Sequence, residues 1–192
     1  MSYTATIFTD TVPVTEGGLV HTWVTLTDNE GNPYTYSFSP ATKDIFGGPG
    51  EIHPNENPER ATSTKTLVIS KDQFDSMKAE GDKLSSPENT PAYELAANNQ
   101  GENCVTVTDT ILEAGGVDML SDVWRPGQVE DILNGGTGQD YWDKILDKNT
   151  DFAQYIGDKN FETTGDPLWS SIVVSLWTVP ELKQEWKVLI VM

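Results

Sequence analysis

The feature that most restricts the fold is a strand, turn and strand pattern near the start of the chain. Residues 19–27 (LVHTWVTLT) are rich in β-branched and aromatic side chains, which favour an extended backbone. The polar segment 28–33, with its Gly and Pro, predicts a turn, and residues 34–39 (YTYSFS) predict a second strand. We therefore expect an antiparallel hairpin in which Thr27 lies opposite Tyr34.

Two polar side chains of this hairpin come close together in the expected register. His21 lies opposite Pro40, and Ser37 is a diagonal neighbour of His21 across the two strands. This assignment is sensitive to alignment, because a shift of one residue moves every side chain of a strand to the other face.

The 192 residues suit a single α+β domain of ordinary size, which can bury about two-thirds of its unfolded surface. Residues 1–116 would form its core, and residues 117–192 a mainly helical extension that completes the domain. The expected elements are strands at 3–8 and 66–69, a loop at 46–58, a helix at 71–83 opened by a capping box at 70–73, a helix from 104 to the glycines at 115–116, helices at 129–133, 141–146 and 169–177, and a closing strand at 186–192.

Cys104 is the only cysteine, so the chain forms no internal disulfide and the thiol stays available for chemistry. It follows Asn103 and opens an apolar stretch of helical period, which puts the thiol in the first turn of a helix. The unpaired N–H groups and the dipole at a helix start favour a thiolate, and hence a nucleophile. The alternative is a buried structural thiol, since a free cysteine is among the most often buried residue types.

A cysteine nucleophile needs a base that is adjacent in space but can be distant in sequence. His21, on its strand, is the candidate base, and the alternative is a half-buried side chain with no role in catalysis. His53 is the rival base, because Glu51 beside it could raise its pKa. A long Gly- and Pro-rich loop is often a binding loop, so His53 is also a candidate to line a substrate groove.

Charge and motifs exclude several classes of function. The formal charge of -18, from 30 acidic and 12 basic residues, repels phosphate backbones, so we expect no nucleic-acid partner. Solubility alone explains such a charge, and the alternatives are a basic protein partner or a cationic substrate. No phosphate-binding loop, calcium loop or zinc set can be assembled, because the chain has two histidines, one cysteine and no matching motif, so we expect no metal or cofactor.

The start of the sequence lacks the pattern of a signal peptide, and no run reaches the roughly 18 apolar residues of a membrane span. We therefore expect synthesis in the cytoplasm without a signal peptide, and no membrane insertion.

Several short motifs together resemble one family. The histidine strand, the hairpin end at 38–40 (FSP), the Gly-rich loop, and 93–95 (YEL) ahead of 103–104 (NC) are similar to the circularly permuted papain-like cysteine hydrolases. That group includes permuted NlpC-type cell-wall amidases and the relatives of lecithin:retinol acyltransferase. The resemblance covers about residues 17–116, and the histidine precedes the cysteine, as in the permuted branch. It implies an antiparallel sheet packed against the cysteine-bearing helix.

The resemblance also implies roles for particular residues. Cys104 would attack a carbonyl, His21 would accept and return the proton, and Ser37 would orient the imidazole as the third member of a triad. Serine departs from the His, Asn or Asp usual at that position and supplies no charge. We place Asn103 and His53 among the residues that bind substrate.

The expected function is therefore a cysteine amidase or endopeptidase that cleaves amide bonds in peptidoglycan. Without a leader, it would suit an antibacterial toxin that a secretion system exports to a target-cell periplasm and that a basic immunity or chaperone protein neutralises. Two alternatives remain open, which are a noncatalytic binding module of the same fold and a hydrolase or acyltransferase acting on lipid acyl groups. The acyl alternative needs an apolar groove beside Cys104, for which the candidates are Trp124, Trp142, Trp169 and Trp177.

Overall fold

A computed structural model describes residues 2–12, 20–42, 47–95, 101–121 and 123–138. Their elements, in chain order, are β1 (Tyr3–Asp10), β2 (His21–Thr27), β3 (Pro33–Pro40), β4 (Gly47–His53), the short 3-10 helix η2 (Pro58–Arg60), β5 (Ser63–Ile69), α1 (Lys71–Leu84), β6 (Ala92–Glu94), α2 (Cys104–Ala114) and α3 (Pro126–Leu133).

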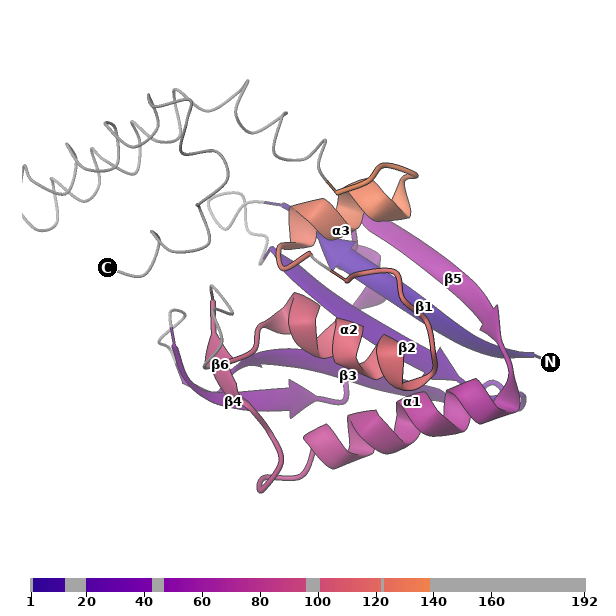
Figure 1. Ribbon diagram of the computed structural model, residues 1–192, viewed down its shortest axis with the longest axis horizontal. Helices are drawn as coiled ribbons and strands as arrows, with labels where there is room; N and C mark the ends of the chain where they lie inside the picture. Colours follow the sequence, from indigo (N-terminus) through magenta and orange to yellow (C-terminus); the bar gives the residue numbers. More distant parts are fainter. Residues whose placement is uncertain (1, 13–19, 43–46, 96–100, 122, 139–192) are drawn as a thin grey trace, which may run out of the picture. The chain divides into compact units, whose positions relative to one another are not determined.

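The strands form one antiparallel sheet in the order β5-β1-β2-β3-β4-β6, and α1, α2 and α3 lie against one of its faces (Figure 1). The expected α+β class is confirmed, as is an antiparallel sheet packed against the cysteine-bearing helix. The strands at 3–8 and 66–69 are present and longer than expected, and the helices at 71–83 and 129–133 are present nearly as expected.

The expected hairpin forms, but its register was wrong by one residue. Thr27 pairs with Pro33 rather than with Tyr34, and Val24 pairs with Tyr36. The cause is the turn, in which the Asp28 N–H donates to the Asn32 carbonyl at 3.1 Å and the Asp28 carboxylate accepts from the Asn32 N–H at 2.9 Å. This side-chain capping closes the turn before Pro33, a bond pattern that composition alone does not reveal.

Strand β3 changes its partner halfway along its length. Its first half pairs with β2 as far as Tyr36, and its second half, from Ser37 to Pro40, pairs with β4. The expectation of a loop at 46–58 was therefore wrong for Gly47–His53, which is β4. Local propensity disfavours a strand with three glycines and a proline, but the ladder to β3 supplies the missing stabilisation.

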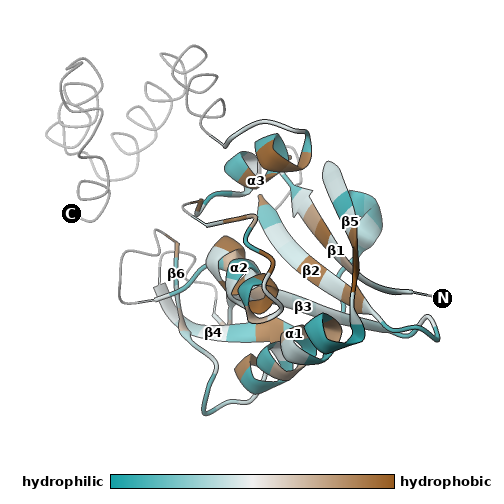
Figure 2. Cartoon of the chain, turned by 45° about the vertical axis from the view of Figure 1, so that its right-hand side comes forward, coloured by the Kyte–Doolittle hydropathy of each residue, from teal (hydrophilic) through white to brown (hydrophobic). Residues whose placement is uncertain are grey.

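Alternate residues of the central strands face the helices and form the core. Figure 2 shows the corresponding apolar bands on the strands and on the helix sides that meet them. Fully burying one such aliphatic side chain stabilises the fold by about 1.5–3 kcal/mol. The core side chains include Ala5, Ile7, Val24, Leu26, Tyr36 and Phe38 from the sheet, Phe74 and Met77 from α1, and Val105, Ile111 and Leu112 from α2.

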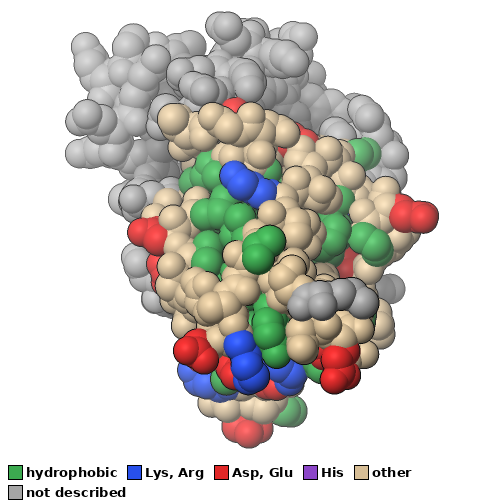
Figure 3. Space-filling view, turned by 90° about the vertical axis from the view of Figure 1, so that its right-hand side faces the viewer, with side chains coloured by type: hydrophobic (Ala, Val, Ile, Leu, Met, Phe, Trp, Pro, Cys, Tyr) green, Lys and Arg blue, Asp and Glu red, His purple; other side chains and the backbone are tan. Residues whose placement is uncertain are grey.

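Helix α1 begins with the expected capping box. The Ser70 hydroxyl accepts from the Gln73 N–H, and the Gln73 side-chain oxygen accepts from the Ser70 N–H. Its outer side carries three lysine–carboxylate pairs within the helix. Both signs of charge gather at the lower end of the face seen in Figure 3, where α1 lies. At Gly81 the helix lies close to the Tyr36 ring, and a Cβ there would come within 2.5 Å of it.

The chain divides into two compact units, Met1–Asp140 and Tyr141–Met192. Helix α3 packs on β1 and β5 and belongs to the first unit. The helices at 141–146 and 169–177 and the closing strand at 186–192 lie outside the described residues, and the single domain over all 192 residues stays a prediction. No helix in the described part of the chain is long and apolar enough to cross a membrane.

Candidate active site at the starts of β2 and α2

Cys104 is the first residue of α2, as expected from the sequence, and the helix ends at Ala114 with Gly115 as its C-cap. Asn103 is the N-cap, and its side-chain oxygen accepts from the N–H groups of Val105 and Thr106 at 2.9 and 3.2 Å. The side-chain nitrogen of Asn103 donates to the carbonyls of Leu95 and Trp124 at 3.2 and 3.0 Å.

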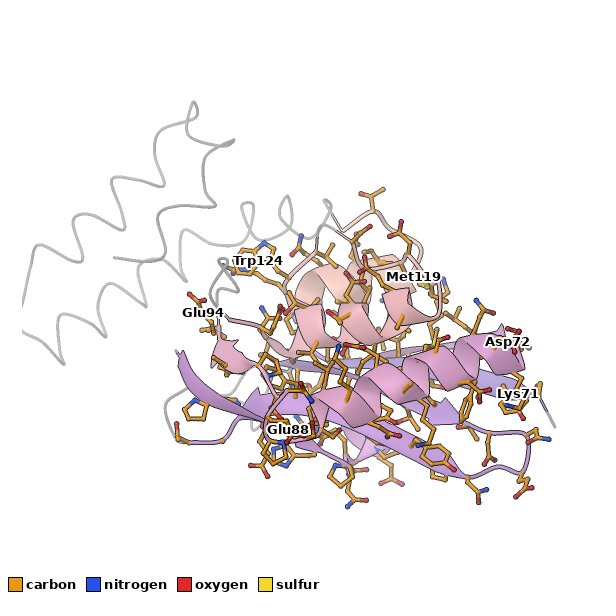
Figure 4. The ribbon with its side chains drawn as sticks, turned by 60° about the horizontal axis from the view of Figure 1, so that its bottom comes forward. Lys71, Asp72, Glu88, Glu94, Met119 and Trp124 are labelled. Carbon is orange, nitrogen blue, oxygen red and sulfur yellow. The ribbon has the colours of Figure 1, made fainter. Side chains whose placement is uncertain are left out.

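These four bonds use the full capacity of the buried Asn103 amide. No side-chain donor or acceptor of Asn103 is left for a ligand in this conformation, and its expected substrate-binding role stays a prediction. Its function is to start α2 and to tie two other segments to it. Figure 4 shows Trp124 and Glu94, the neighbour of Leu95, at the end of the molecule where α2 begins.

The Cys104 side chain lies in the hydrophobic core, and the residue is only 6% exposed. Burial raises the pKa of the Cys104 thiol to about 11, although bonds from the N–H groups of Thr22 and Val105 act in the opposite direction. The expectation of a thiolate at the helix start was thus wrong for this conformation, because desolvation outweighs the helix terminus.

His21 is the first residue of β2 and is buried. Its Nε2 lies 2.8 Å from the Ser37 Oγ, and its ring stacks on Trp23 with centroids 5.7 Å apart. Burial lowers the pKa of His21 to about 4, against the opposing attraction of Glu56. The imidazole is therefore neutral near pH 7.

The structure brings His21 and Ser37 together as the sequence predicts, but through the corrected register. Extending the observed pairing places His21 opposite Ser39, so that Ser37, two residues away, shares the face of the histidine. Beyond Val24 and Tyr36 the two strands no longer pair, and the His21–Ser37 bond connects them there.

His21 and Cys104 reach the same segment of β2 from different sides. The ring lies on the Trp23 side of the sheet, whereas the sulfur arrives from α2 and meets the amide of Thr22, the residue after His21. No hydrogen bond joins the sulfur to the imidazole, both of which belong to the described part of the chain. The expected proton-sharing contact is therefore not formed in this conformation.

A charged network that the sequence analysis missed supports the histidine. Ser37 donates to Glu56 at 2.9 Å, Glu56 accepts from Arg60 at 3.0 Å, and Arg60 also donates to the buried Asp10 at 3.1 Å. The Arg60 guanidinium lies 5.8 Å from the Trp23 ring centroid. The only sequence signal was an acid four residues before one of just two arginines, a spacing too common to point to a site.

His53 lies at the end of β4 beside this network but does not replace His21. Its Nε2 lies 2.8 Å from the Ser39 Oγ, and its Nδ1 lies 4.0 Å from Glu51. The side chain is 41% exposed, so a ligand can reach it. Its expected role in substrate binding stays a prediction.

Tyr93 of β6 is a second residue that the sequence analysis did not place in the site. It is buried, and its ring packs 5.7 Å from that of Phe38. Burial, together with the charge of a Cys104 thiolate, raises the pKa of its phenol to about 12. Tyr93 is thus a neutral hydrogen-bond donor in the neighbourhood of the sulfur.

The protonation states show which form of the site is stable at rest. Burial disfavours both charged forms, because it raises the pKa of Cys104 to about 11 and lowers the pKa of His21 to about 4. The resting pair is therefore a neutral thiol and a neutral imidazole.

No known family model matches the sequence, and no curated protein or solved structure is significantly similar to it. In the described ranges, no group of three or more His, Cys, Asp or Glu side chains is arranged to hold a metal ion.

Proposed function

We propose that this protein is a cysteine hydrolase of the permuted papain-like type that cleaves amide bonds, with Cys104 as nucleophile and His21 as base. The observation that carries the proposal is the position of the thiol. It lies in the first turn of a helix, against the amide that follows a histidine held by Ser37. These are the parts that thiol catalysis uses, namely a nucleophile, a neighbouring base and a group that orients the base.

The proposed reaction has two halves. The Cys104 thiol gives its proton to His21 while the sulfur bonds to the amide carbon. Collapse of the tetrahedral intermediate breaks the C–N bond, and His21 returns the proton to the leaving amine. Water then hydrolyses the thioester. The Cys104 N–H and the Tyr93 hydroxyl are the candidate donors for the oxyanion, each typically worth roughly 3 kcal/mol.

Catalysis requires a change from the resting state, because the sulfur is buried and the proton transfer is costly there. The requirement is that the imidazole turns toward the sulfur and that the thiol becomes accessible. Because the ring and the sulfur lie on different sides of β2, this turn requires a backbone change at the start of the strand, where Val20, a non-glycine residue, has a φ of 46°.

The substrate class rests on the resemblance, which points to the stem peptides of peptidoglycan. The test is digestion of purified peptidoglycan and of soluble stem peptides by the full chain, followed by detection of new amino groups. We expect cleavage by the wild-type protein and by the Ser39→Ala variant, and none by Cys104→Ala or Cys104→Ser. A protein that cleaves no amide and forms no adduct with an electrophilic peptide would refute the proposal.

An antibacterial role is part of the same proposal. Expression behind a periplasmic leader should then be toxic, and expression in the cytoplasm should not. Equal harmlessness in both compartments would remove this part of the proposal. A neutralising partner would be basic, to complement the charge of -18.

A noncatalytic binding module is the second candidate, and the burial of Cys104 specifically favours it. A structural thiol needs neither access nor ionisation, and both are lacking in the resting state. Binding to insoluble peptidoglycan that survives the Cys104→Ala substitution, with no cleavage by either protein, is the result that would select the module. Release of fatty acid from lipid esters would instead select the acyl hydrolase.

A further inference from the structure

Among the described residues, the hydroxyl of Ser37 is the one group that is within hydrogen-bond distance of both the His21 imidazole and the Glu56 carboxylate. The Ser37 Oγ lies 2.8 Å from the His21 Nε2 and 2.9 Å from the Glu56 Oε2, whereas Nε2 and Oε2 are 3.8 Å apart. A serine hydroxyl has one hydrogen to donate, so it can be a donor in only one of these two bonds.

The direction of both bonds follows from the charge on Glu56. Its other oxygen accepts from the Arg60 guanidinium, which in turn binds Asp10, so that Glu56 belongs to a charged network and is an acceptor only. Ser37 therefore donates its hydrogen to Glu56. Toward His21, the same oxygen can only accept.

A neutral imidazole carries one N–H, and here it has to be on Nε2, where the acceptor is. Nδ1 then holds the free lone pair. The groups around the ring are compatible with a neutral state: the carboxylates of Glu56 and Asp10 attract a proton, but Arg60 and burial oppose it, and the pKa falls to about 4. Without Glu56, Ser37 could donate to Nε2 equally well, and the opposite tautomer would be allowed.

We propose that Glu56 is a positioning residue that acts through Ser37 to fix His21 as the Nε2–H tautomer, which leaves Nδ1 as its basic nitrogen. The role of Nδ1 in accepting the thiol proton rests on the proposed hydrolase function, but the tautomer does not. Ser37 then differs from an ordinary third member of a triad, because the Glu56 carboxylate, bonded to its hydroxyl, decides that Ser37 accepts from His21.

The tautomer can be measured directly, because the chain has only two histidines. The full chain is labelled with ¹⁵N, and the imidazole nitrogens are observed near neutral pH through their couplings to the ring carbon-bound protons. A His53→Gln variant assigns the remaining signals to His21. We expect a protonated-type shift for Nε2 of His21 and an unprotonated-type shift for Nδ1.

Two variants test the role of Glu56. Glu56→Gln presents a donor as well as an acceptor to Ser37, so both His21 nitrogens should shift toward averaged values of a tautomer mixture. Ser37→Ala removes the hydroxyl that connects His21 to Glu56 and should also give a mixture of His21 tautomers. The test therefore stays available if one of the two variants fails to fold. The matched control is Glu51→Gln beside His53, which should not change the His21 signals.

An Nδ1–H ring in the wild-type protein would overturn the proposal. So would a pure Nε2–H ring in a folded Glu56→Gln or Ser37→Ala variant. The measurement needs neither substrate nor thiol chemistry, so its failure is distinguishable from failure of the hydrolase. An inactive protein with the expected tautomer keeps the role of Glu56 and discards the hydrolase, whereas an active one with an Nδ1–H ring does the reverse.

Discussion

Acidification should destabilise this protein by an amount that can be assigned to His21. The pKa of His21 is about 4 in the folded chain, lowered chiefly by burial, and 6.5 is its ordinary value. Between these values the unfolded chain binds a proton at His21 and the folded chain does not. The His21 contribution is therefore complete above about pH 6.5 and is lost as the pH falls toward 4. From about pH 7.5 to about pH 4.5 the loss is about 2.5 kcal/mol.

The assay is urea unfolding of the wild-type chain and a His21→Gln variant at several pH values in this range, followed by tryptophan fluorescence. The 30 acidic residues titrate in both proteins, so their effects largely cancel in the difference. We expect the stability advantage of the wild-type protein over His21→Gln to shrink by about 2.5 kcal/mol on acidification.

The control is Ser76→Ala, at an exposed position of α1, because this substitution removes no titratable group. Its difference from the wild-type chain should change little with pH. If the difference between wild type and His21→Gln were constant to within about 0.5 kcal/mol over the whole range, His21 would not be a buried neutral ring, and the reasoning on its surroundings would be refuted.

Three further predictions concern the core and the start of α2. Native Cys104 should react slowly with iodoacetamide at pH 7, since its thiolate is about 100-fold scarcer than that of a thiol with the reference pKa, and the rate should rise with pH toward about 11. Asn103→Ala should lower the free energy of unfolding by about 2 kcal/mol, because it removes the cap of α2 and the two bonds that its side chain donates to the carbonyls of Leu95 and Trp124. Gly81→Ala should cost about 2 kcal/mol, since its Cβ would meet the Tyr36 ring. Urea unfolding measures the change in stability of the Asn103→Ala and Gly81→Ala variants.

Each of these predictions has a matched control. In urea the unfolded chain should alkylate at the ordinary rate, and a native rate equal to it would contradict the burial of Cys104. Asn103→Asp keeps the capping oxygen and should recover part of the loss, whereas full recovery would show that the two donated bonds contribute nothing. Ser76→Ala, at an exposed position of α1, should leave the free energy of unfolding nearly unchanged. If Gly81→Ala also left it nearly unchanged, a clash with the Tyr36 ring would be excluded.

The parts of the fold that the sequence predicted are those set by local chemistry. The capping box at Ser70 and the apolar period after Cys104 each place a helix start at a single residue, since caps and periodicity are encoded within a few positions. The hairpin was also predicted from local composition. Its register was not predicted correctly, because the hydrogen bonds of the Asp28 side chain decide where the turn closes.

The parts that could not be predicted depend on partners distant in sequence. Strand β4 forms in a Gly- and Pro-rich segment only because β3 offers a free edge there. The acidity of Cys104 depends on how much of the core surrounds it, and Glu56 acquires its role only through Ser37 and Arg60. In the candidate site the residue types were predictable, but the direction and protonation of the side chains were not.

Because β3 changes its partner halfway along its length, different strands protect the backbone amides of its two halves from hydrogen exchange. Amides in residues 34–36 are held by β2 at the centre of the sheet, whereas those in residues 37–39 depend on β4, a strand that has three glycines and so offers few side chains to anchor it. A local opening that detached β4 would release the second half of β3 and leave the first half in place. Ser37 lies at this boundary, so such an opening would also loosen the residue that is hydrogen-bonded to the His21 imidazole.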